Sequence, residues 1–463
     1  TKSELPAVGS ALLYLFAPYR FSLIFVRGSP EFLAYAILPV VLYLYAKLME
    51  SEGRRMIFYA FLAAIAGGLL TISHNFTVMF LMPIILLYLA VKILLDKPPL
   101  KKIVWIALSF ISAFGFGAFF IGPAVLEQKY TQIGHNFLQW REHFPTLGQL
   151  IKSKWGYFYS SLGTANDGMS FMLGYAQWVV LGLVFIWLIY LFVKNRKNAK
   201  EVLVKNIWTV LFFIMSLGTI YLILPISIPV WEKIKLLQDI QFSWRLLGIA
   251  IFTISALFGF WLASIKNKKI VWILFIVVSG LAIYGNRNHL LPQPVSVDDL
   301  YRYDDFEHLH PHRYSTTTLG DDVLAPSATR ACWFSDFVVL DENDKELSQE
   351  VVSKGNTYGF VKFRGYEKII LNLGYFPGAY EIYASGKKVD YSDCKGRVCL
   401  EKEALREDGY NFLSWKIVQT PIQKTFNYIT LGFLVFWILM LIQKKDNRKF
   451  FAIAFIFLIF GFF

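Results

Sequence analysis

The pattern of apolar and polar positions along the chain contains ten long apolar runs. They lie at 32–49, 56–72, 77–95, 103–121, 174–193, 206–225, 245–264, 270–285, 427–443 and 450–463. A helix of about 20 apolar residues crosses the hydrocarbon core of a bilayer. Because the runs approach this length and hold few charges, they predict a polytopic α-helical membrane protein with about ten transmembrane helices.

The pattern changes between the eighth and ninth runs, where apolar stretches shorten and alternate with polar residues, as in "YGFVKF" and "AYEIYASG". This period of two residues predicts a small extracytoplasmic antiparallel β domain of sandwich or jelly-roll type. We therefore expect three parts: a transmembrane domain at 1–285, the β domain at 286–426, and C-terminal transmembrane helices at 427–463. Within the first part, 4–19, 122–173 and 226–244 are expected to form interfacial helices and loops on the outer side.

Charge indicates how these helices are oriented. The 463 residues carry a net charge of +13, and the loops after the first, third, fifth, seventh and ninth runs are basic, as in "KNRKNAKEVLVK" and "KKDNRK". Since basic loops stay in the cytoplasm, residues 1–31, 122–173, 226–244 and 286–426 should lie outside a cytoplasmic (plasma) membrane that the chain crosses many times. The excess charge also suits anionic lipids. Membrane lipids are thus expected partners, and nucleic acid is not.

The three cysteines all lie in the region predicted to form the β domain. Cys394 and Cys399 flank a glycine turn in "DCKGRVC", and both a disulfide and free thiols remain open. Together with Cys332 they do not have the spacing of a zinc site.

The start "TKSELPAVGS" has neither an initiator Met nor the basic and apolar regions of a signal peptide. We expect the chain to be a fragment or processed form whose true N-terminus is missing.

Charged residues at the outer ends of two membrane helices are the first candidates for a binding site. Arg20, Arg27 and Glu31 precede the first run in "PYRFSLIFVRGSPEF", and Arg245 begins the seventh in "LLQDIQFSWRLLG". Because the positive-inside rule does not require basic residues there, an outer arginine suits bidentate binding of a phosphate. Glu31 would orient it or act as a base. The alternative is snorkelling with a local ion pair.

Other polar residues at the outer side are weaker candidates for substrate binding. They are His74 and Asn75 in "ISHNFT", Glu127 and Lys129 in "GPAVLEQKY", Asp167 and Gln177 before the fifth run, and Gln241 and Trp244 beside Arg245. Helix capping and a wet membrane interface explain such residues equally well. The cluster "DDFEHLHPHRY" leaves a divalent metal open, but no cofactor or metal ligand is assigned with certainty, and the sequence contains no P-loop, HExxH motif or nucleophile elbow.

Several segments together resemble a known family. They are "APYRFSLIFVRGSPEFLAYAILP", "LTISHNFTVMFLMPII", "FFIGPAVLEQKY", "DGMSFMLGYAQ", "DIQFSWRLLG", "TTTLGDDVLAP", "GYFPGAYEIYASGKKVDY" and "VQTPIQKTFNYITL". In this order they resemble the bacterial and archaeal membrane proteins described as pyruvoyl-tetrahydropterin-synthase-related or YfhO-like, members of the GT-C glycosyltransferase superfamily. Ser243 stands where the family pattern usually has proline, and the WWDYG motif of the oligosaccharyltransferase branch is absent.

The resemblance implies an inverting glycosyltransferase that moves a sugar from a polyprenyl-phosphate donor to a glycan, lipid or protein acceptor of the cell envelope. In GT-C enzymes the key acid lies in the first outer loop, which would precede Thr1, so the catalytic acid is unknown and Glu31 is a candidate helper. Arginines would hold the departing phosphate. The alternatives are a non-catalytic transporter or flippase of lipid-linked sugars, and an envelope assembly scaffold whose β domain binds partners.

Overall fold

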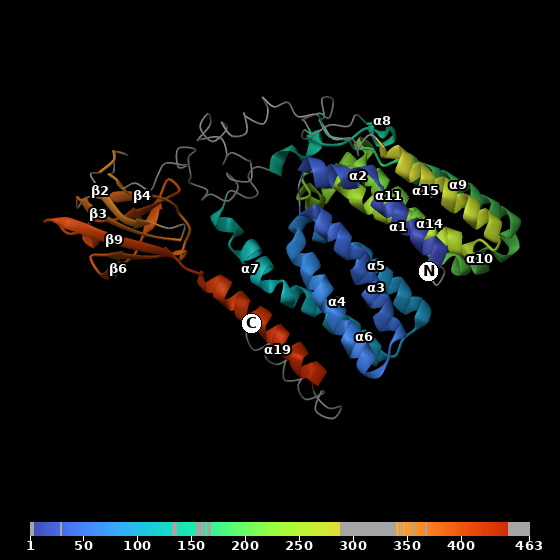
Figure 1. The fold of residues 1–463 in the computed structure, drawn as a ribbon, viewed down its shortest axis with the longest axis horizontal. Helices are drawn as coiled ribbons and strands as arrows, with labels where there is room; N and C mark the ends of the chain where they lie inside the picture. The colour runs from blue at the N-terminus through green and yellow to red at the C-terminus, as the bar shows by residue number, and fades with distance from the viewer. Residues whose placement is uncertain are drawn as a thin grey trace. The chain divides into compact units, whose positions relative to one another are not determined.

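The computed structural model describes residues 4–27, 30–131, 137–153, 160, 163, 168–287, 339–341, 343, 345–347, 349–354, 357–365 and 368–442 (Figure 1). They divide between two compact units. The first unit comprises Thr1–Phe110 with Phe137–Gln293, and the second comprises Ile111–Asn136 with Pro294–Phe463. The segment 111–136, which the sequence grouped with the transmembrane domain, therefore belongs to the same unit as the β-strands.

Seven of the described helices are long and apolar enough to cross a membrane. They are α3 (Glu31–Glu50), α4 (Gly53–Ser73), α5 (Asn75–Asp96, within which Val78–Asp96 is the apolar span), α9 (Tyr175–Lys194), η6 with α14 (Ser243–Leu246 and Leu247–Ser264), α15 (Lys268–Gly285) and α19 (Pro421–Ile442). Each coincides with a predicted apolar run. The mostly helical architecture expected from the sequence is thus confirmed for these seven runs.

Three further pairs of helices pass the same test only if each bent pair is counted as one span. They are α1 (Glu4–Leu15) with Pro18–Ile24, bent by 51°, α6 (Leu100–Phe116) with α7 (Ala118–Leu126), bent by 66°, and Arg196–Lys205 with α11 (Ile207–Ile223), bent by 85°. The second and third pairs contain the predicted runs at 103–121 and 206–225. The tenth predicted run, 450–463, lies outside the described residues.

The first helix, α1, which was expected to be interfacial, packs along α14. Ser10 Oγ donates a hydrogen bond of 2.6 Å to the carbonyl oxygen of Ser255. A Cβ on Gly259 would lie 3.1 Å from the Cβ of Ser10, so the helices touch where both carry small residues. Small residues let helices approach closely in an apolar environment. The chain then turns at Ala17 into α2 (Pro18–Phe21) and η1 (Ser22–Arg27).

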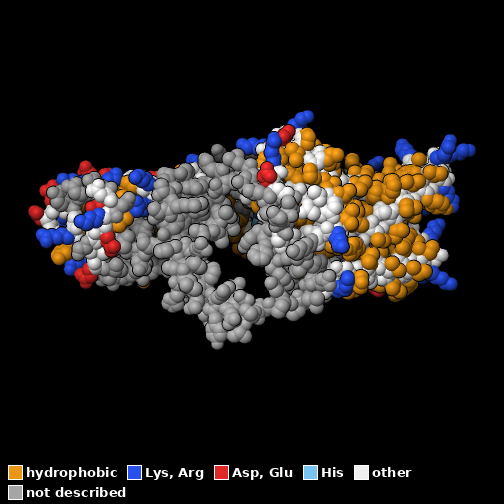
Figure 2. All heavy atoms as spheres, turned by 90° about the horizontal axis from the view of Figure 1, so that it is seen from above, with side chains coloured by type: hydrophobic (Ala, Val, Ile, Leu, Met, Phe, Trp, Pro, Cys, Tyr) orange, Lys and Arg blue, Asp and Glu red, His pale blue; other side chains and the backbone are white. Residues whose placement is uncertain are grey.

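Between α7 and α9 and between α11 and α14, where interfacial helices and loops were expected, the described elements are short. They are η2 (Gln128–Tyr130), η3 (Phe137–Glu142), α8 (Leu147–Ile151), η5 (Pro225–Ser227), α12 (Ile228–Lys233) and α13 (Lys235–Gln238). Figure 2 shows a hydrophobic surface over α9 and α15. On it Ile186, Val193, Ile273 and Ile276 are each more than 60% exposed, as expected of side chains that face lipid.

The second unit contains an antiparallel β domain. Its strands are β1 (Val339–Leu340), β2 (Gln349–Lys354), β3 (Tyr358–Arg364), β4 (Ile369–Gly374), β5 (Tyr380–Ala384), β6 (Lys387–Val389), β7 (Ser392–Cys394), β8 (Arg397–Leu400) and β9 (Tyr410–Ile417). One sheet has the order β1-β4-β8-β7 and the other β2-β3-β9-β5-β6. Inward residues of both sheets, among them Phe363, Leu371 and Trp415, form one apolar core. This is the two-layer packing of a sandwich.

The tight β7–β8 hairpin resolves the question about the cysteines. Lys395 and Gly396 both have positive φ, at 55° and 84°, which is the backbone of a two-residue type I′ turn. Asp393 Oδ1 accepts a hydrogen bond of 2.7 Å from the Gly396 amide. Cys394 and Cys399 form a disulfide across this hairpin, with a Cα–Cα distance of 5.7 Å. Cys332 lies outside the described residues.

A buried ion-pair cluster at the ends of α3 and α14

Glu31, the first residue of α3, is the centre of a polar cluster in the first unit. Its side chain is fully buried, and Oε1 lies 2.8 Å from Nε of Arg245. The Tyr19 hydroxyl donates to Oε2 at 3.4 Å, and Nε2 of His74 lies 3.7 Å from Oε1. Three segments far apart in sequence therefore converge on one carboxylate. A buried carboxylate is tolerated only with such charged and hydrogen-bonding neighbours.

Arg245 reaches Glu31 from η6, the turn that begins the α14 span, and it is 5% exposed. Its Nη1 donates a hydrogen bond of 2.8 Å to the carbonyl oxygen of Ile240, and its Cζ lies 4.8 Å from the ring centroid of Phe242. A cation at a helix N-terminus opposes the helix dipole. The charge of Arg245 is therefore stabilised by Glu31 and by these contacts, because the helix dipole at this position is unfavourable for a cation.

Tyrosines connect this ion pair to a second buried arginine, Arg20. The Tyr35 hydroxyl donates a hydrogen bond of 2.7 Å to the carbonyl oxygen of Arg245. The Cζ of Arg20 lies 5.0 Å from the centroid of the same ring and 3.9 Å from that of Tyr14. Arg20 is 8% exposed, and no carboxylate of the described residues lies within ion-pair distance. Its Nη2 is buried without a hydrogen-bond partner. Aromatic faces stabilise such a cation only in part.

The structure thus brings together four of the residues that the sequence proposed for binding: Arg20, Glu31, His74 and Arg245. Trp244 is also near, but it is 2% exposed and stacks on Phe242 with a centroid distance of 5.0 Å, so it is a buried packing residue and not an exposed interfacial anchor.

The remaining candidates contribute no described side-chain contact to this cluster. Gln241 precedes Trp244 in a left-handed conformation with φ of 70°. The side chains of Arg27 and Asn75, and all of Asp167, lie outside the described residues.

Gln177 and Glu127 have structural contacts that the sequence did not suggest. Gln177 in α9 is 1% exposed, and its Nε2 donates to the carbonyl oxygen of Leu13 at 3.1 Å, which ties α9 to α1. Glu127 belongs to the second unit, where its carboxylate accepts hydrogen bonds from Thr420 and Gln423 at the start of α19. An anionic group at a helix N-terminus is stabilising. Lys129 in η2 is exposed.

Sequence reasoning missed the tyrosines of the cluster. Tyr14, Tyr19 and Tyr35 lie in apolar stretches with the spacing of ordinary membrane-helix residues. The signal that would have revealed them is their proximity to Arg20 and Glu31 in sequence, because a buried tyrosine hydroxyl needs a polar partner. No sequence pattern indicated that Tyr35 would hydrogen-bond to the backbone of Arg245, a residue 210 positions away.

His143 lies beside the cluster in the segment after η3. Its Nδ1 is 3.0 Å from Oγ of Ser160, and its ring meets that of Phe242 edge-on at a centroid distance of 4.6 Å. Ser243 Oγ donates to the carbonyl oxygen of His143 at 2.9 Å. Burial, together with the positive charge of Arg245, lowers the pKa of His143 to about 4. The folded protein therefore favours the neutral imidazole of His143 over the protonated one.

Acid should destabilise the first unit through His143. In the unfolded chain the imidazole binds a proton below about pH 6.5, whereas in the folded protein it does so only below about pH 4. The unfolded state thus binds more protons between these values, and the free energy of unfolding falls as the pH is lowered through this window. Thermal unfolding of the wild type and of His143→Asn at pH values from 8 to 4 measures this fall in the free energy of unfolding. Equal slopes for the two proteins between pH 6.5 and 4 would contradict the assignment.

Neither the search for metal-binding groups nor the comparison with known proteins indicates a function for this chain. Among the described residues, no group of three or more His, Cys, Asp or Glu side chains could hold a metal ion; the histidines of "DDFEHLHPHRY" lie outside them, and a divalent metal stays an open prediction. No protein-family model, no curated protein and no solved structure matches the chain. The resemblance to GT-C proteins therefore remains a hypothesis.

Proposed function

We propose that the protein is a GT-C-type glycosyltransferase that uses a polyprenyl-phosphate sugar at the outer face of the plasma membrane. The observation that carries this proposal is the buried contact between Glu31 and Arg245. Taking two charges out of water costs several kcal/mol per ion, and a well-packed apolar pair is often as stable or more stable. Stability alone therefore does not explain this pair. A phosphate ligand would explain why Arg245 and Arg20 are placed here.

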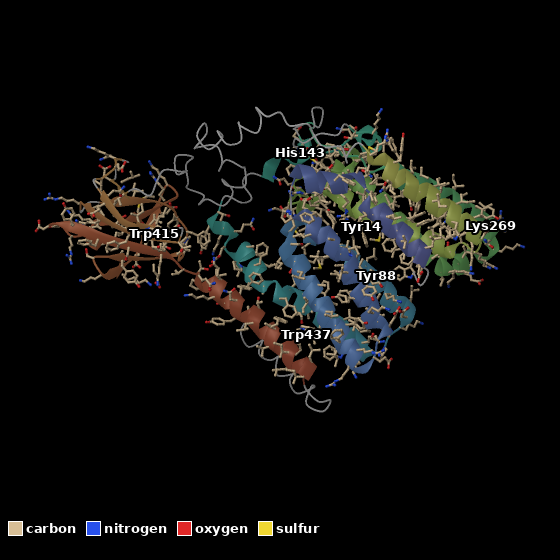
Figure 3. The ribbon with its side chains drawn as sticks, in the orientation of Figure 1. Tyr14, Tyr88, His143, Lys269, Trp415 and Trp437 are labelled. Atoms are coloured by element: carbon tan, nitrogen blue, oxygen red, sulfur yellow. A yellow bond between two sulfur atoms is a disulfide. The ribbon has the colours of Figure 1, made fainter. Side chains whose placement is uncertain are left out.

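The position of the cluster along the helices supports an outer location. Figure 3 shows His143, which adjoins the cluster, and Lys269 at opposite ends of the helices that include α14 and α15. Arg245 begins the α14 span, and Lys266, Lys268 and Lys269 follow it. Since basic loops favour the cytoplasm, the end with Arg245 would face outward. The disulfide of the β domain supports an oxidising compartment for that domain as well.

In the proposed reaction Arg245 contacts the donor phosphate and stabilises the negative charge that it gains as the sugar leaves. The bond between the anomeric carbon and the phosphate oxygen breaks, and a bond from that carbon to the acceptor oxygen forms. The proton of the acceptor hydroxyl passes to a carboxylate outside this cluster. Glu31 has the role of orienting Arg245, because its Oε1 contacts Nε of the guanidinium. Arg20, at the neighbouring tyrosines, adds positive charge to the same region.

Binding of radiolabelled polyprenyl-phosphate hexoses to the purified full chain in neutral detergent tests this proposal. We expect Arg245→Gln to weaken donor binding at least tenfold, about 1.4 kcal/mol, and polyprenyl phosphate without a sugar to compete. The matched control is Arg141→Gln, which removes another arginine from an ion pair with a glutamate of the same unit, Glu232, where both partners are exposed. This control should bind the donor like the wild type.

A second variant separates loss of binding from loss of folding. Glu31→Gln with Arg245→Gln removes both charges together, so the fold should survive while donor binding is lost. If this double variant unfolds like the wild type and still binds the donor with wild-type affinity, the proposed site is wrong. Donor binding without sugar transfer by the full-length protein, which would include the first outer loop, would favour the transporter or scaffold alternatives.

A further inference from the structure

The end of the helices opposite the cluster carries a concentration of exposed basic side chains. They are Lys194, Arg196, Lys197, Lys200 and Lys205 around η4 (Arg196–Asn198) and α10 (Ala199–Lys205), and Lys266, Lys268 and Lys269 between α14 and α15. Glu201 is the single acidic residue in these two segments. Lysine and arginine side chains cover this end in Figure 2, and Lys269 marks it in Figure 3. Its potential is therefore strongly positive.

The segment Arg196–Lys205 has the geometry of a helix that lies on a membrane surface. It is bent by 85° from α11, the apolar helix that follows it. If α11 crosses the bilayer, this segment runs nearly parallel to the bilayer plane. Leu203 and Val204 are 37% and 56% exposed, and they stand between Lys200 and Lys205 in the sequence. Exposed aliphatic side chains among basic ones are typical of interfacial helices.

The same segment forms an open depression with a volume of about 590 Å³, lined by Asn198, Lys200, Glu201, Val204 and Lys205. Its lining thus combines the aliphatic side chain of Val204 with two lysines and one glutamate, which leaves an excess of one positive charge. This combination matches the phosphate and upper acyl chain of a phospholipid, whereas a nucleic acid would leave the exposed aliphatic side chains without a partner. A purely topological role for the basic residues would require neither the bend nor the exposed Leu203 and Val204.

We propose that Arg196–Lys205, together with Lys266, Lys268 and Lys269, binds the headgroups of anionic phospholipids in the cytoplasmic leaflet. Anionic headgroups complement the charge of this surface, since each Lys or Arg near an anionic leaflet contributes to the attraction. The inference rests on the membrane placement in the proposed function, but not on the sugar donor. Arg245 and Lys266 stand at the two ends of α14, which at 1.5 Å per residue is about 27 Å long.

The test measures binding of short-chain phosphatidylglycerol to the purified full chain in neutral detergent, with phosphatidylcholine of the same chain length as the zwitterionic reference. Binding is followed by the shift in unfolding temperature. We expect phosphatidylglycerol to bind at least tenfold more tightly than phosphatidylcholine. Four substitutions, Arg196→Gln, Lys197→Gln, Lys200→Gln and Lys205→Gln, should abolish this preference. The matched control removes four exposed lysines of the β domain with Lys345→Gln, Lys387→Gln, Lys395→Gln and Lys402→Gln, and should keep it.

A measurement on the wild type alone covers the case in which the quadruple variant fails to fold. Raising the salt concentration from about 0.05 M to about 0.5 M should weaken phosphatidylglycerol binding several-fold, because salt screens exposed charges. A preference that is insensitive to salt, that survives in the quadruple variant, or that disappears equally in the β-domain control would overturn the inference. The donor-binding test remains separate, because the quadruple variant should bind polyprenyl-phosphate hexoses like the wild type.

Discussion

Replacing Arg245 with methionine is expected to lower the free energy of unfolding by about 3–5 kcal/mol. The change removes the cation that lies 2.8 Å from the fully buried carboxylate of Glu31 and leaves that charge among largely apolar neighbours. The hydroxyl of Tyr19 and the imidazole of His74, at 3.4 and 3.7 Å, compensate for it only in part. Unfolding of the purified protein by heat or by a denaturing detergent measures the loss.

The double variant Glu31→Leu with Arg245→Met is the control for this prediction. It removes both charges and fills the space with apolar groups, so its stability should return to within about 1 kcal/mol of the wild type or exceed it. A double variant that is as unstable as Arg245→Met would mean that the ion pair stabilises the fold directly. Stability would then be sufficient to explain the ion pair, and no ligand would be needed to account for it.

Gly248→Ala is expected to destabilise the first unit by about 3 kcal/mol. Gly248 is the second residue of α14, and a Cβ there would overlap the ring of Tyr35 in α3. Added volume at a tight contact forces side chains and backbone to move, which typically costs about 1–3 kcal/mol and occasionally more. The upper end of this range is expected because the Tyr35 hydroxyl is also held by the carbonyl oxygen of Arg245.

Gly280→Ala provides the matched comparison for Gly248→Ala. Gly280 lies within α15, and no heavy atom would lie within 4 Å of a Cβ at this position. Alanine should therefore stabilise this helix by about 0.5–1 kcal/mol through its better helix propensity. Thermal unfolding of both variants measures the difference. If the two alanine variants have the same stability, the close approach of α3 and α14 at Tyr35 is not present in solution.

Regular helices and strands were readable from the chain because each depends on a local period. Apolar runs gave α3, α9 and α15 within a few residues, since a helix that faces lipid must be apolar along its whole length. Alternation gave strands such as β3 and β9, whose inward residues Phe363 and Trp415 meet in the core. Breaks inside apolar segments were not readable. The 51° bend between α1 and Pro18–Ile24 falls at Ala17, inside an apolar stretch.

For the candidate site, the sequence likewise indicated individual residues but not the contacts between them. Its charged members were visible in the sequence because Arg20, Glu31 and Arg245 are costly where apolar helices begin. Only the family resemblance led us to expect Arg245 near Glu31 or His74; no local pattern indicated the direct contact with Glu31, 214 positions away, or the hydrogen bond between Glu127 and Thr420. Composition and periodicity determine which segments avoid water. Which polar groups share a buried space depends on how those segments pack, because a buried charge is stable only where another part of the chain supplies its partner.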